Sequence, residues 1–329
     1  MRKLDIYNMC GIAGIFSPDH NNISTDRLKR MTDAIKHRGP DGENFWINSA
    51  GIAGLGHRRL SIIDLSENAS QPMHFLDRYT IVHNGEIYNY IELKEKLQKK
   101  GYSFQSLSDT EIILAAYDRW KDECVDHFDG MFAFAIWDET EKKLFAARDR
   151  FGEKPFFYYY DSNQFLFASE MKALWAAGIE RKANQKMLFN FITIGYVDNP
   201  NQPDETFFEK INKLPAASCL TYKASTHELS PEKYWDIDPE NENKKITDKE
   251  AIGQFNTLFS ASVKKRLRSD VSIGTSLSGG IDSSSIIAVS RKFNVVNDSH
   301  KCFTAAFPGF EKDELVFSKI VAQKFGMQQ

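Results

Sequence analysis

Short apolar runs alternate with amphipathic stretches from residue 10 to about residue 235. The run Met131-Phe132-Ala133-Phe134-Ala135-Ile136-Trp137 is apolar at every position, which is typical of a strand covered on both faces. Helical spacing of Leu28, Met31 and Ile35 predicts one helix, and residues 110–120 predict another. The predicted strands are residues 10–16, 79–83, 131–137, 143–147 and 165–168. Two sheets with helices outside them satisfy this pattern.

A polar stretch at residues 236–249 predicts a solvated linker before a second domain. Thr247 and Glu250 have the spacing of a capping box, and apolar residues then recur at helical intervals, so a helix is expected over 249–267. The elements predicted after it are strands at 271–277 and 301–307 and helices at 282–293 and 313–325. This order is typical of a parallel α/β sheet. Because two strands rarely form a stable sheet, the second domain is expected to be incomplete in this chain.

The charge, apolar runs and cysteines of the chain indicate which kinds of partner it can bind. The net charge is -3, and acidic and basic residues are interspersed, so nothing predicts binding to nucleic acid or to a membrane surface. No apolar run approaches the roughly 20 residues that span a bilayer, and the chain has no apolar signal core at its start, so we expect a cytoplasmic protein that acts on small molecules. The cysteines, Cys10, Cys124, Cys219 and Cys302, form no C-x-x-C pair, which favours reduced thiols over disulfides or a zinc site.

Cys10 is the candidate nucleophile. The commoner fate of a free cysteine is a small buried apolar residue. In the string Met9-Cys10-Gly11-Ile12, however, translation from Met9 followed by removal of the methionine would make Cys10 the first residue. Its α-amine, with a reference pKa of about 8, could then take the thiol proton near neutral pH. The other route to a free amine is removal of residues 1–9 as a propeptide. If neither route operates, the Cys10 nitrogen stays in a peptide bond and cannot act as the base.

Successive motifs after Cys10 resemble those of the class II glutamine amidotransferases, in order. They are His37-Arg38-Gly39-Pro40-Asp41-Gly42, His57-Arg58-Arg59-Leu60-Ser61-Ile62-Ile63-Asp64, Asn84-Gly85-Glu86-Ile87-Tyr88-Asn89, Ser108-Asp109-Thr110-Glu111 and Ala147-Arg148-Asp149. The resemblance covers residues 10–235. It implies the N-terminal nucleophile hydrolase fold, an α+β four-layer αββα sandwich.

The resemblance also implies roles for individual residues. Cys10, Asn84 and Gly85 would be catalytic, with the Asn84 side chain and the Gly85 N–H forming the oxyanion hole. The residues expected to bind glutamine are Arg59, Leu60, Ser61, Ile62, Ile63, Asn84, Gly85, Glu86 and Asp109. Arg59 would hold the substrate α-carboxylate and Asp109 its α-ammonium, while Arg38 would shape the loop over the nucleophile. Each of these roles has a structural alternative. Arg59 could be an ordinary surface arginine, and Asn84-Gly85 could form a tight turn. Asp109 could simply begin a helix, with Ser108 and Glu111 as its capping box.

A second candidate site lies in the string Ser276-Leu277-Ser278-Gly279-Gly280-Ile281-Asp282-Ser283-Ser284, between a predicted strand and a predicted helix. A Gly-rich turn there can aim backbone N–H groups at an anion, and no Walker lysine is present. The string resembles the signature loop of ATP pyrophosphatases. The residues expected to bind ATP or pyrophosphate are Leu277, Ser278, Gly279, Gly280, Asp282, Ser283, Ser284 and Ala305. Asp282 would also bind Mg²⁺. The alternatives are core packing for Leu277 and Ala305 and a helix N-terminal acid for Asp282. No prosthetic group is expected.

A glutaminase followed by a pyrophosphatase is the domain order of the glutamine-dependent asparagine synthetase family, which the chain resembles from Met9 onward. The implied domains are an extension or propeptide at 1–9, a glutaminase at 10–235, a linker at 236–249 and a partial synthetase domain at 250–329. The implied substrates are glutamine, ATP and aspartate, with a β-aspartyl-AMP intermediate and ammonia passed between the sites. Two alternatives remain: an amidotransferase for another carboxylate, such as that of a surface-polysaccharide sugar, and a catalytically silent regulatory fragment. A second copy of the chain, in a homodimer, is a further candidate partner.

Overall fold

The computed structural model describes residues 9–19, 22–242, 245–293 and 300–329. The chain divides into two compact units, 1–237 and 238–329. The N-terminal extension was predicted at residues 1–9, of which all but Met9 lie outside the described residues.

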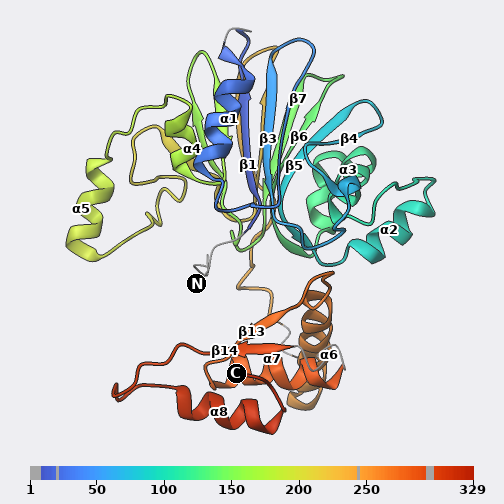
Figure 1. Ribbon diagram of the computed structural model, residues 1–329, viewed down its shortest axis with the longest axis vertical. Helices are drawn as coiled ribbons and strands as arrows, with labels where there is room; N and C mark the ends of the chain where they lie inside the picture. Colours follow the sequence, from blue (N-terminus) through green and yellow to red (C-terminus); the bar gives the residue numbers. More distant parts are fainter. Residues whose placement is uncertain (1–8, 20–21, 243–244, 294–299) are drawn as a thin grey trace. The chain divides into compact units, whose positions relative to one another are not determined.

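Unit 1 contains two six-stranded antiparallel sheets with helices outside them (Figure 1). The order in the first sheet is β10 (Ile211–Lys213), β8 (Phe157–Tyr160), β9 (Phe165–Ala168), β1 (Gly11–Phe16), β3 (Ala53–Arg59) and β2 (Gly42–Ile47). The order in the second sheet is β12 (Glu228–Lys233), β11 (Ser218–Lys223), β7 (Lys143–Arg148), β6 (Gly130–Asp138), β5 (Tyr79–Ile87) and β4 (Met73–Phe75). Helices α1 (Thr25–Ala34) and α4 (Met171–Ala176) pack near the first sheet, and α2 (Tyr90–Gln98) and α3 (Asp109–Trp120) near the second. Unit 1 also contains α5 (Gln185–Ile194) and the 3-10 helices η2 (Glu67–Ala69) and η3 (Lys121–His127).

Side-chain alternation along β6 shows why four layers form. Phe132, Phe134 and Ile136 belong to the core under α3, whereas Ala133, Ala135 and Trp137 belong to the core between the two sheets. A third core joins β1 and β9 to α1 and α4. The prediction of a strand covered on both faces is therefore confirmed, and so is the αββα sandwich.

Unit 2 begins a parallel α/β arrangement. Its elements are α6 (Asp248–Arg266), β13 (Gly274–Ser276), α7 (Ile281–Lys292), β14 (Lys301–Phe303) and α8 (Leu315–Lys324). The predicted capping box is confirmed, because Thr247 and Glu250 bond each other's backbone N–H at the start of α6. The predicted strands at 271–277 and 301–307 are too long. Parallel pairing runs only from Gly274 opposite Lys301 to Ser276 opposite Phe303, and backbone without a ladder partner does not form a strand.

Candidate active site

A pocket in unit 1 gathers eight of the nine residues predicted to bind glutamine, together with Cys10. The predicted residues on its wall are Cys10, Arg59, Leu60, Ile62, Ile63, Asn84, Gly85, Glu86 and Asp109. They come from the start of β1, the end of β3 and its following loop, the second half of β5, and the start of α3. Ser61 is the exception. Its backbone N–H donates to Asp41 Oδ2 at 2.8 Å, and it is not among the lining residues.

The Cys10 thiol lies against the backbone of Leu60. Leu60 N donates to Cys10 Sγ at 3.3 Å, and Cys10 Sγ lies 3.5 Å from Leu60 O. Burial raises the pKa of the Cys10 thiol, while the Leu60 hydrogen bond and the charges of Lys154 and Arg59 oppose that rise. Arg38 Nε donates to Cys10 O at 2.9 Å, so the expected loop-shaping arginine fixes the nucleophile's own backbone. The thiol is therefore held in place and needs a base or a positive charge to ionise near neutral pH.

Asn84 and Gly85 lie inside β5 and do not form a tight turn. A Cβ on Gly85 would lie 2.1 Å from Met131 O on β6, so only glycine allows the two strands to approach this closely. Asn84 is 1% exposed, and its Nδ2 has no hydrogen-bond partner among the residues that the structure describes. Buried amide donors normally have a partner. This N–H₂ group is thus a free donor on the pocket wall.

The Gly85 N–H points to the same side. Gly85 pairs with Phe132, but Phe132 N and O bond Asp149, at 3.2 Å and 2.8 Å, so the Gly85–Phe132 pair is not hydrogen-bonded. In such a pair the backbone groups face away from the partner strand. His83 and Ile87, two positions before and after Gly85 on β5, direct their N–H groups to the same side of the strand as Gly85. His83 N donates to Gln71 Oε1 at 2.6 Å, and Ile87 N donates to Asp109 Oδ2 at 2.8 Å. The Gly85 N–H therefore faces the pocket edge of β5, and Asn84 lines the same pocket.

Asp109 and Glu86 bring two carboxyl groups to this pocket. Burial raises the pKa of Asp109 to about 6, although hydrogen bonds from Ile87 N and Thr110 N oppose the rise. Burial and the neighbouring Asp109 raise the pKa of Glu86 to about 7. Unpaired buried carboxylates attract a cation. Asp109 is also the first residue of α3, capped by Ser108, but the expected capping box does not close: Glu111 accepts from the backbone of Gln105 and Ser106 instead.

Arg59 lies at the end of β3 and organises the loop that follows it. Its guanidinium donates to Ser66 O at 2.9 Å and Asp64 O at 2.5 Å. The Asp64 carboxylate in turn accepts from Leu107 N at 2.8 Å, which ties this loop to the segment before α3. A guanidinium has five N–H donors, so these bonds leave donors for a carboxylate ligand.

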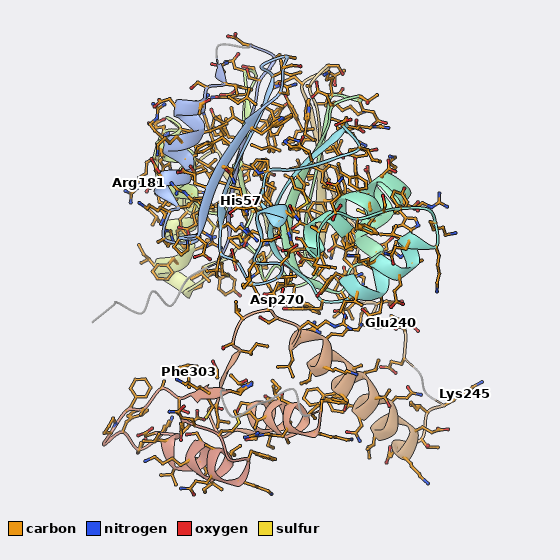
Figure 2. All side chains as sticks on the ribbon, turned by 45° about the vertical axis from the view of Figure 1, so that its right-hand side comes forward. His57, Arg181, Glu240, Lys245, Asp270 and Phe303 are labelled. Carbon is orange, nitrogen blue, oxygen red and sulfur yellow. The ribbon has the colours of Figure 1, made fainter. Side chains whose placement is uncertain are left out.

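Sequence reasoning missed Lys154, Gln71 and His83, all of which line the pocket. Lys154 is 6% exposed, and burial lowers its pKa. Gln71 and His83 each bond Thr110. His57 Nε2 lies 3.2 Å from His83 O; Figure 2 labels His57 within unit 1. Burial lowers the pKa of both histidines to about 3, so they are neutral near pH 7. Gln71 and His83 lie outside the recognised motifs, so the sequence contained no signal for them. The signal available for Lys154 was its position five residues after Asp149, in the Ala147-Arg148-Asp149 motif.

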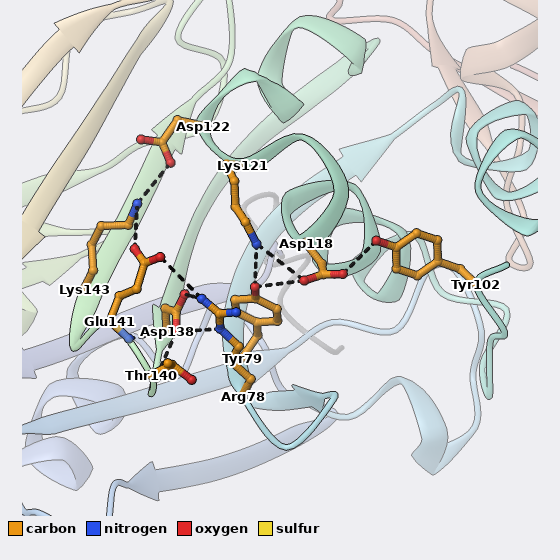
Figure 3. Close-up of polar contacts among 10 residues, drawn as sticks. All are labelled: Arg78, Tyr79, Tyr102, Asp118, Lys121, Asp122, Asp138, Thr140, Glu141 and Lys143. Carbon is orange, nitrogen blue, oxygen red and sulfur yellow. Dashed lines mark hydrogen bonds and ion pairs between the residues drawn. The ribbon is translucent and has the colours of Figure 1, made fainter. Parts of the chain in front are cut away.

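A larger, more open hollow of about 870 Å³ lies elsewhere in unit 1, beside α3, and includes Tyr102, Asp118 and Arg119. Its central carboxylate is already bonded: Asp118 accepts from Tyr79 at 2.9 Å and from Tyr102 at 2.7 Å, and Lys121 donates to Tyr79 (Figure 3). This network stabilises the fold around α3 and is separate from the Cys10 pocket.

In unit 2, the predicted pyrophosphate loop lies between β13 and α7. A Cβ on Gly279, which has a φ of 91°, would lie 2.5 Å from Ser318 N, so glycine allows the loop to approach α8. Gly280 begins α7 without a side-chain cap, and Ser284 Oγ is buried without a partner among the described residues, so donors are left for an anion. Leu277 is 1% exposed and packs in the core of unit 2, whereas Ala305 is exposed. Ser278 Oγ and Ser283 Oγ lie 3.1 Å apart.

The Mg²⁺ expectation depends on Asp282, an exposed residue in the first turn of α7. Within the described ranges, no group of three or more His, Cys, Asp or Glu side chains could hold a metal ion by itself. This is compatible with Mg²⁺, which commonly binds through one or two carboxylates plus substrate phosphates and water. The residues of the loop therefore fit a nucleotide with its counter-ion better than a metal alone.

Comparison with known proteins extends these observations. A family model for the glutamine amidotransferase domain matches residues 9–235, and one for asparagine synthase matches residues 254–329. The chain is 38% identical to glutamine-hydrolysing asparagine synthetase 3 of Bacillus subtilis over 85% of its length, and 35% identical to the same organism's asparagine synthetase 1 over 97%. It is 32% identical, over 97% of its length, to the amidase chry2 of Gibberella zeae. The chain spans 45%, 49% and 50% of the lengths of these relatives.

Among solved structures, the chain resembles a glutamine phosphoribosylpyrophosphate amidotransferase from B. subtilis, with a TM-score of 0.52 and 14% identity, over 97% of this chain and 89% of that one. This likeness supports the fold alone. In the part of the chain that the structure describes, no helix has the length and apolar character needed to cross a membrane.

Proposed function

Since the chain belongs to the glutamine amidotransferase family, we propose that unit 1 hydrolyses glutamine to glutamate and ammonia with Cys10 as the nucleophile. The Cys10 sulfur would attack the side-chain amide carbon, forming a C–S bond and a tetrahedral oxyanion. Collapse would expel ammonia, and water would hydrolyse the thioester to glutamate. The free α-amine of Cys10 would take the thiol proton and return it to the leaving nitrogen.

One observation carries this proposal: the Asn84 amide, which has no partner among the described residues, and the Gly85 N–H, which faces away from β6, line the pocket that also holds the Cys10 thiol. Two such donors in the pocket of a nucleophile suit an oxyanion that forms only during the reaction. The buried carboxyl groups of Asp109 and Glu86 would attract the substrate α-ammonium. Arg59 would hold the substrate α-carboxylate, and Leu60, Ile62 and Ile63 would cover the bound glutamine.

Met9 must leave for this chemistry to occur. In the described chain it precedes Cys10 and lines the pocket, whose free volume is about 50 Å³, room for a water molecule or two. Removal of residues up to Met9 would both free the Cys10 amine and enlarge the pocket for glutamine. The assignment of residues 1–9 as an extension or propeptide stays a prediction.

We further propose that the whole protein uses the ammonia to amidate aspartate through a β-aspartyl-AMP intermediate, with ATP on the loop of Ser278, Gly279 and Gly280 in unit 2. The asparagine synthase match to residues 254–329 supports this acceptor. ATP supplies the leaving group that activates the carboxylate. Asp282 would hold the Mg²⁺, and Ser283 and Ser284 would contribute hydroxyl groups. The cytoplasmic location and the homodimer also stay predictions.

A second candidate is amidation of a different carboxylate, because a relative that is not named an asparagine synthetase, the amidase chry2, also matches 97% of the chain. A silent regulatory fragment is disfavoured by the retention of Cys10, Asn84, Gly85 and Asp109 in one pocket.

Glutamate release, measured on protein whose first residue has been fixed by intact mass, tests the glutaminase proposal. We expect an active chain that begins at Cys10, and a loss of on the order of 1,000-fold or more in Cys10→Ala. Cys219→Ala, which removes another free thiol from the same unit, is the control and should keep its activity. An active chain that retains Met9, or equal activity in Cys10→Ala, would refute the mechanism.

A further inference from the structure

Lys154 is a buried amine in the same pocket as the nucleophile. It is 6% exposed and lines the Cys10 pocket, and its Nζ lies 3.2 Å from Met9 Sδ, on the residue directly before Cys10. Lysine is rarely buried to this degree without a charged partner or a function. The amine therefore requires an explanation that packing does not provide.

The loop that carries Lys154 is held rigidly by Asp149. The Asp149 carboxylate accepts from the backbone N–H groups of Phe151 at 3.1 Å, Glu153 at 2.9 Å and Lys154 at 2.9 Å. Arg148 adds a hydrogen bond from Nε to Lys154 O at 2.7 Å. The Arg148-Asp149 motif thus has a structural role: it fixes the backbone from which Lys154 reaches into the pocket.

Charges of both signs face the thiol. The Asp109 carboxylate, at the start of α3, raises the pKa of Cys10, whereas Lys154 and Arg59 lower it. Burial lowers the pKa of Lys154, the charge of Glu86 on β5 opposes that fall, and the charge of Arg38 adds to it. Arg59 already donates two hydrogen bonds to its own loop. Lys154 Nζ instead contacts a thioether, Met9 Sδ, and its charge offsets the effect of Asp109 on Cys10.

We propose that Lys154 is a positioning residue whose ammonium stabilises the thiolate form of Cys10. The inference deepens the proposed glutaminase and rests on its assignment of Cys10 as nucleophile. An ammonium beside the sulfur lowers the free energy of the thiolate relative to the thiol, and the low polarity of the pocket strengthens the attraction. The same charge would also disfavour protonation of a free Cys10 amine, which keeps that amine available as a base.

The test is a thiolate titration of Cys10 in the full chain, followed by thiolate ultraviolet absorbance against the matching Cys10→Ala protein and by the rate of iodoacetamide alkylation at Cys10. In Lys154→Met, which keeps the length and apolar stem of the side chain, we expect the Cys10 titration to move up by about one unit. Alkylation at pH 7 should slow by up to about tenfold. Lys154→Arg should titrate like wild type.

A role in packing alone predicts the reverse order, since methionine fits a buried position and the larger arginine does not. Lys143→Met is the matched control, because Lys143 is also largely buried in unit 1 but pairs with Asp122 and Glu141 (Figure 3), and it should leave the titration unchanged. An unshifted titration in Lys154→Met would overturn the inference. A shifted titration in a protein that releases no glutamate would instead uphold the inference and refute the proposed glutaminase.

Discussion

The Asp109 carboxylate, at the start of α3, accepts a hydrogen bond from Ile87 N at the edge of β5, at 2.8 Å. Four residues earlier on the same strand, the Gln71 side chain accepts from His83 N. Side chains thus replace a neighbouring strand on both sides of Gly85, beyond the short β4 pairing of Tyr79–Ile81. This leaves one backbone N–H of the strand edge facing the pocket beside the Asn84 amide.

Asn84→Ala should separate catalysis from stability. Loss of an oxyanion donor is expected to lower kcat by roughly 100- to 1,000-fold with little change in KM. Stability should hardly change, because the Asn84 Nδ2 has no partner to lose among the described residues. Asn48→Ala is the opposite control: Asn48 accepts from Ile52 N and Ala53 N, so its loss should destabilise the protein without lowering kcat. Steady-state kinetics and denaturant unfolding check both variants, and an unchanged kcat in Asn84→Ala would contradict the oxyanion role.

Gly85→Ala should damage both the strand and the site. The added methyl group would lie 2.1 Å from Met131 O, so β5 and β6 must separate next to the nucleophile. We expect destabilisation of roughly 1–3 kcal/mol and loss of glutamate release. Gly253→Ala is the control, because nothing lies within 4 Å of a Cβ there and α6 should gain up to about 1 kcal/mol from alanine. A fully stable and active Gly85→Ala protein would show that the strands do not approach as described.

Much of the fold was predictable from the sequence because it follows from local patterns. The continuous apolar run of β6 predicted a strand buried on both faces. The structure confirms this, because alternate residues of β6 lie in two different cores. The length of β5 was not predictable in the same way. Asn84-Gly85 has the composition of a turn, and only the approach of Met131, 46 positions after Gly85 in the chain, explains why the strand continues through it.

The candidate site shows the same division. Motif residues such as Arg59 and Asp109 were identified because each stands in a recognisable string. Lys154 was missed because its importance depends on a loop folded around Asp149 and on where that loop meets β1. Ser61 does not line the pocket, because its N–H binds Asp41, and no pattern within residues 59–63 distinguishes it from its neighbours on the pocket wall. Its role in glutamine binding stays a prediction.

Asp118→Asn should weaken the fold but spare the site. Burial raises the pKa of Asp118, but hydrogen bonds from Tyr102 and Tyr79 outweigh it, so the pKa lies below its usual range (Figure 3). We expect a loss of roughly 1–3 kcal/mol at pH 7, with glutamate release retained. A lowered carboxyl pKa stabilises above the unfolded value, about 3.9, and this contribution is lost as the pH falls through the folded value. The two proteins should therefore converge in acid. Asp122→Asn, at an exposed ion pair, should cost at most about 1 kcal/mol.

Glu86→Gln should give the opposite dependence on pH. Burial raises the pKa of Glu86 to about 7, against about 4.3 in an unfolded chain, so between these values the folded protein binds more protons and wild type loses stability as the pH rises. Glutamine cannot ionise. The variant should match wild type near pH 4 and exceed it by up to about 3 kcal/mol above pH 7, while glutamine binding weakens.

Chemical denaturation from pH 4 to pH 8 measures this difference, with the exposed Glu123→Gln as a charge-matched control that should show no such trend. His57 supplies a check on the sign. Burial lowers the pKa of His57 to about 3 in the folded protein, against about 6.5 in the unfolded chain. As the pH falls below about 6.5, the unfolded chain therefore binds a proton that the folded protein does not, and the folded protein loses stability. Because the two groups act in opposite directions, the wild-type profile alone cannot reveal either one. Only the difference between Glu86→Gln and wild type isolates the carboxyl group, and a difference that stays constant with pH would mean that Glu86 is not held in a desolvated pocket.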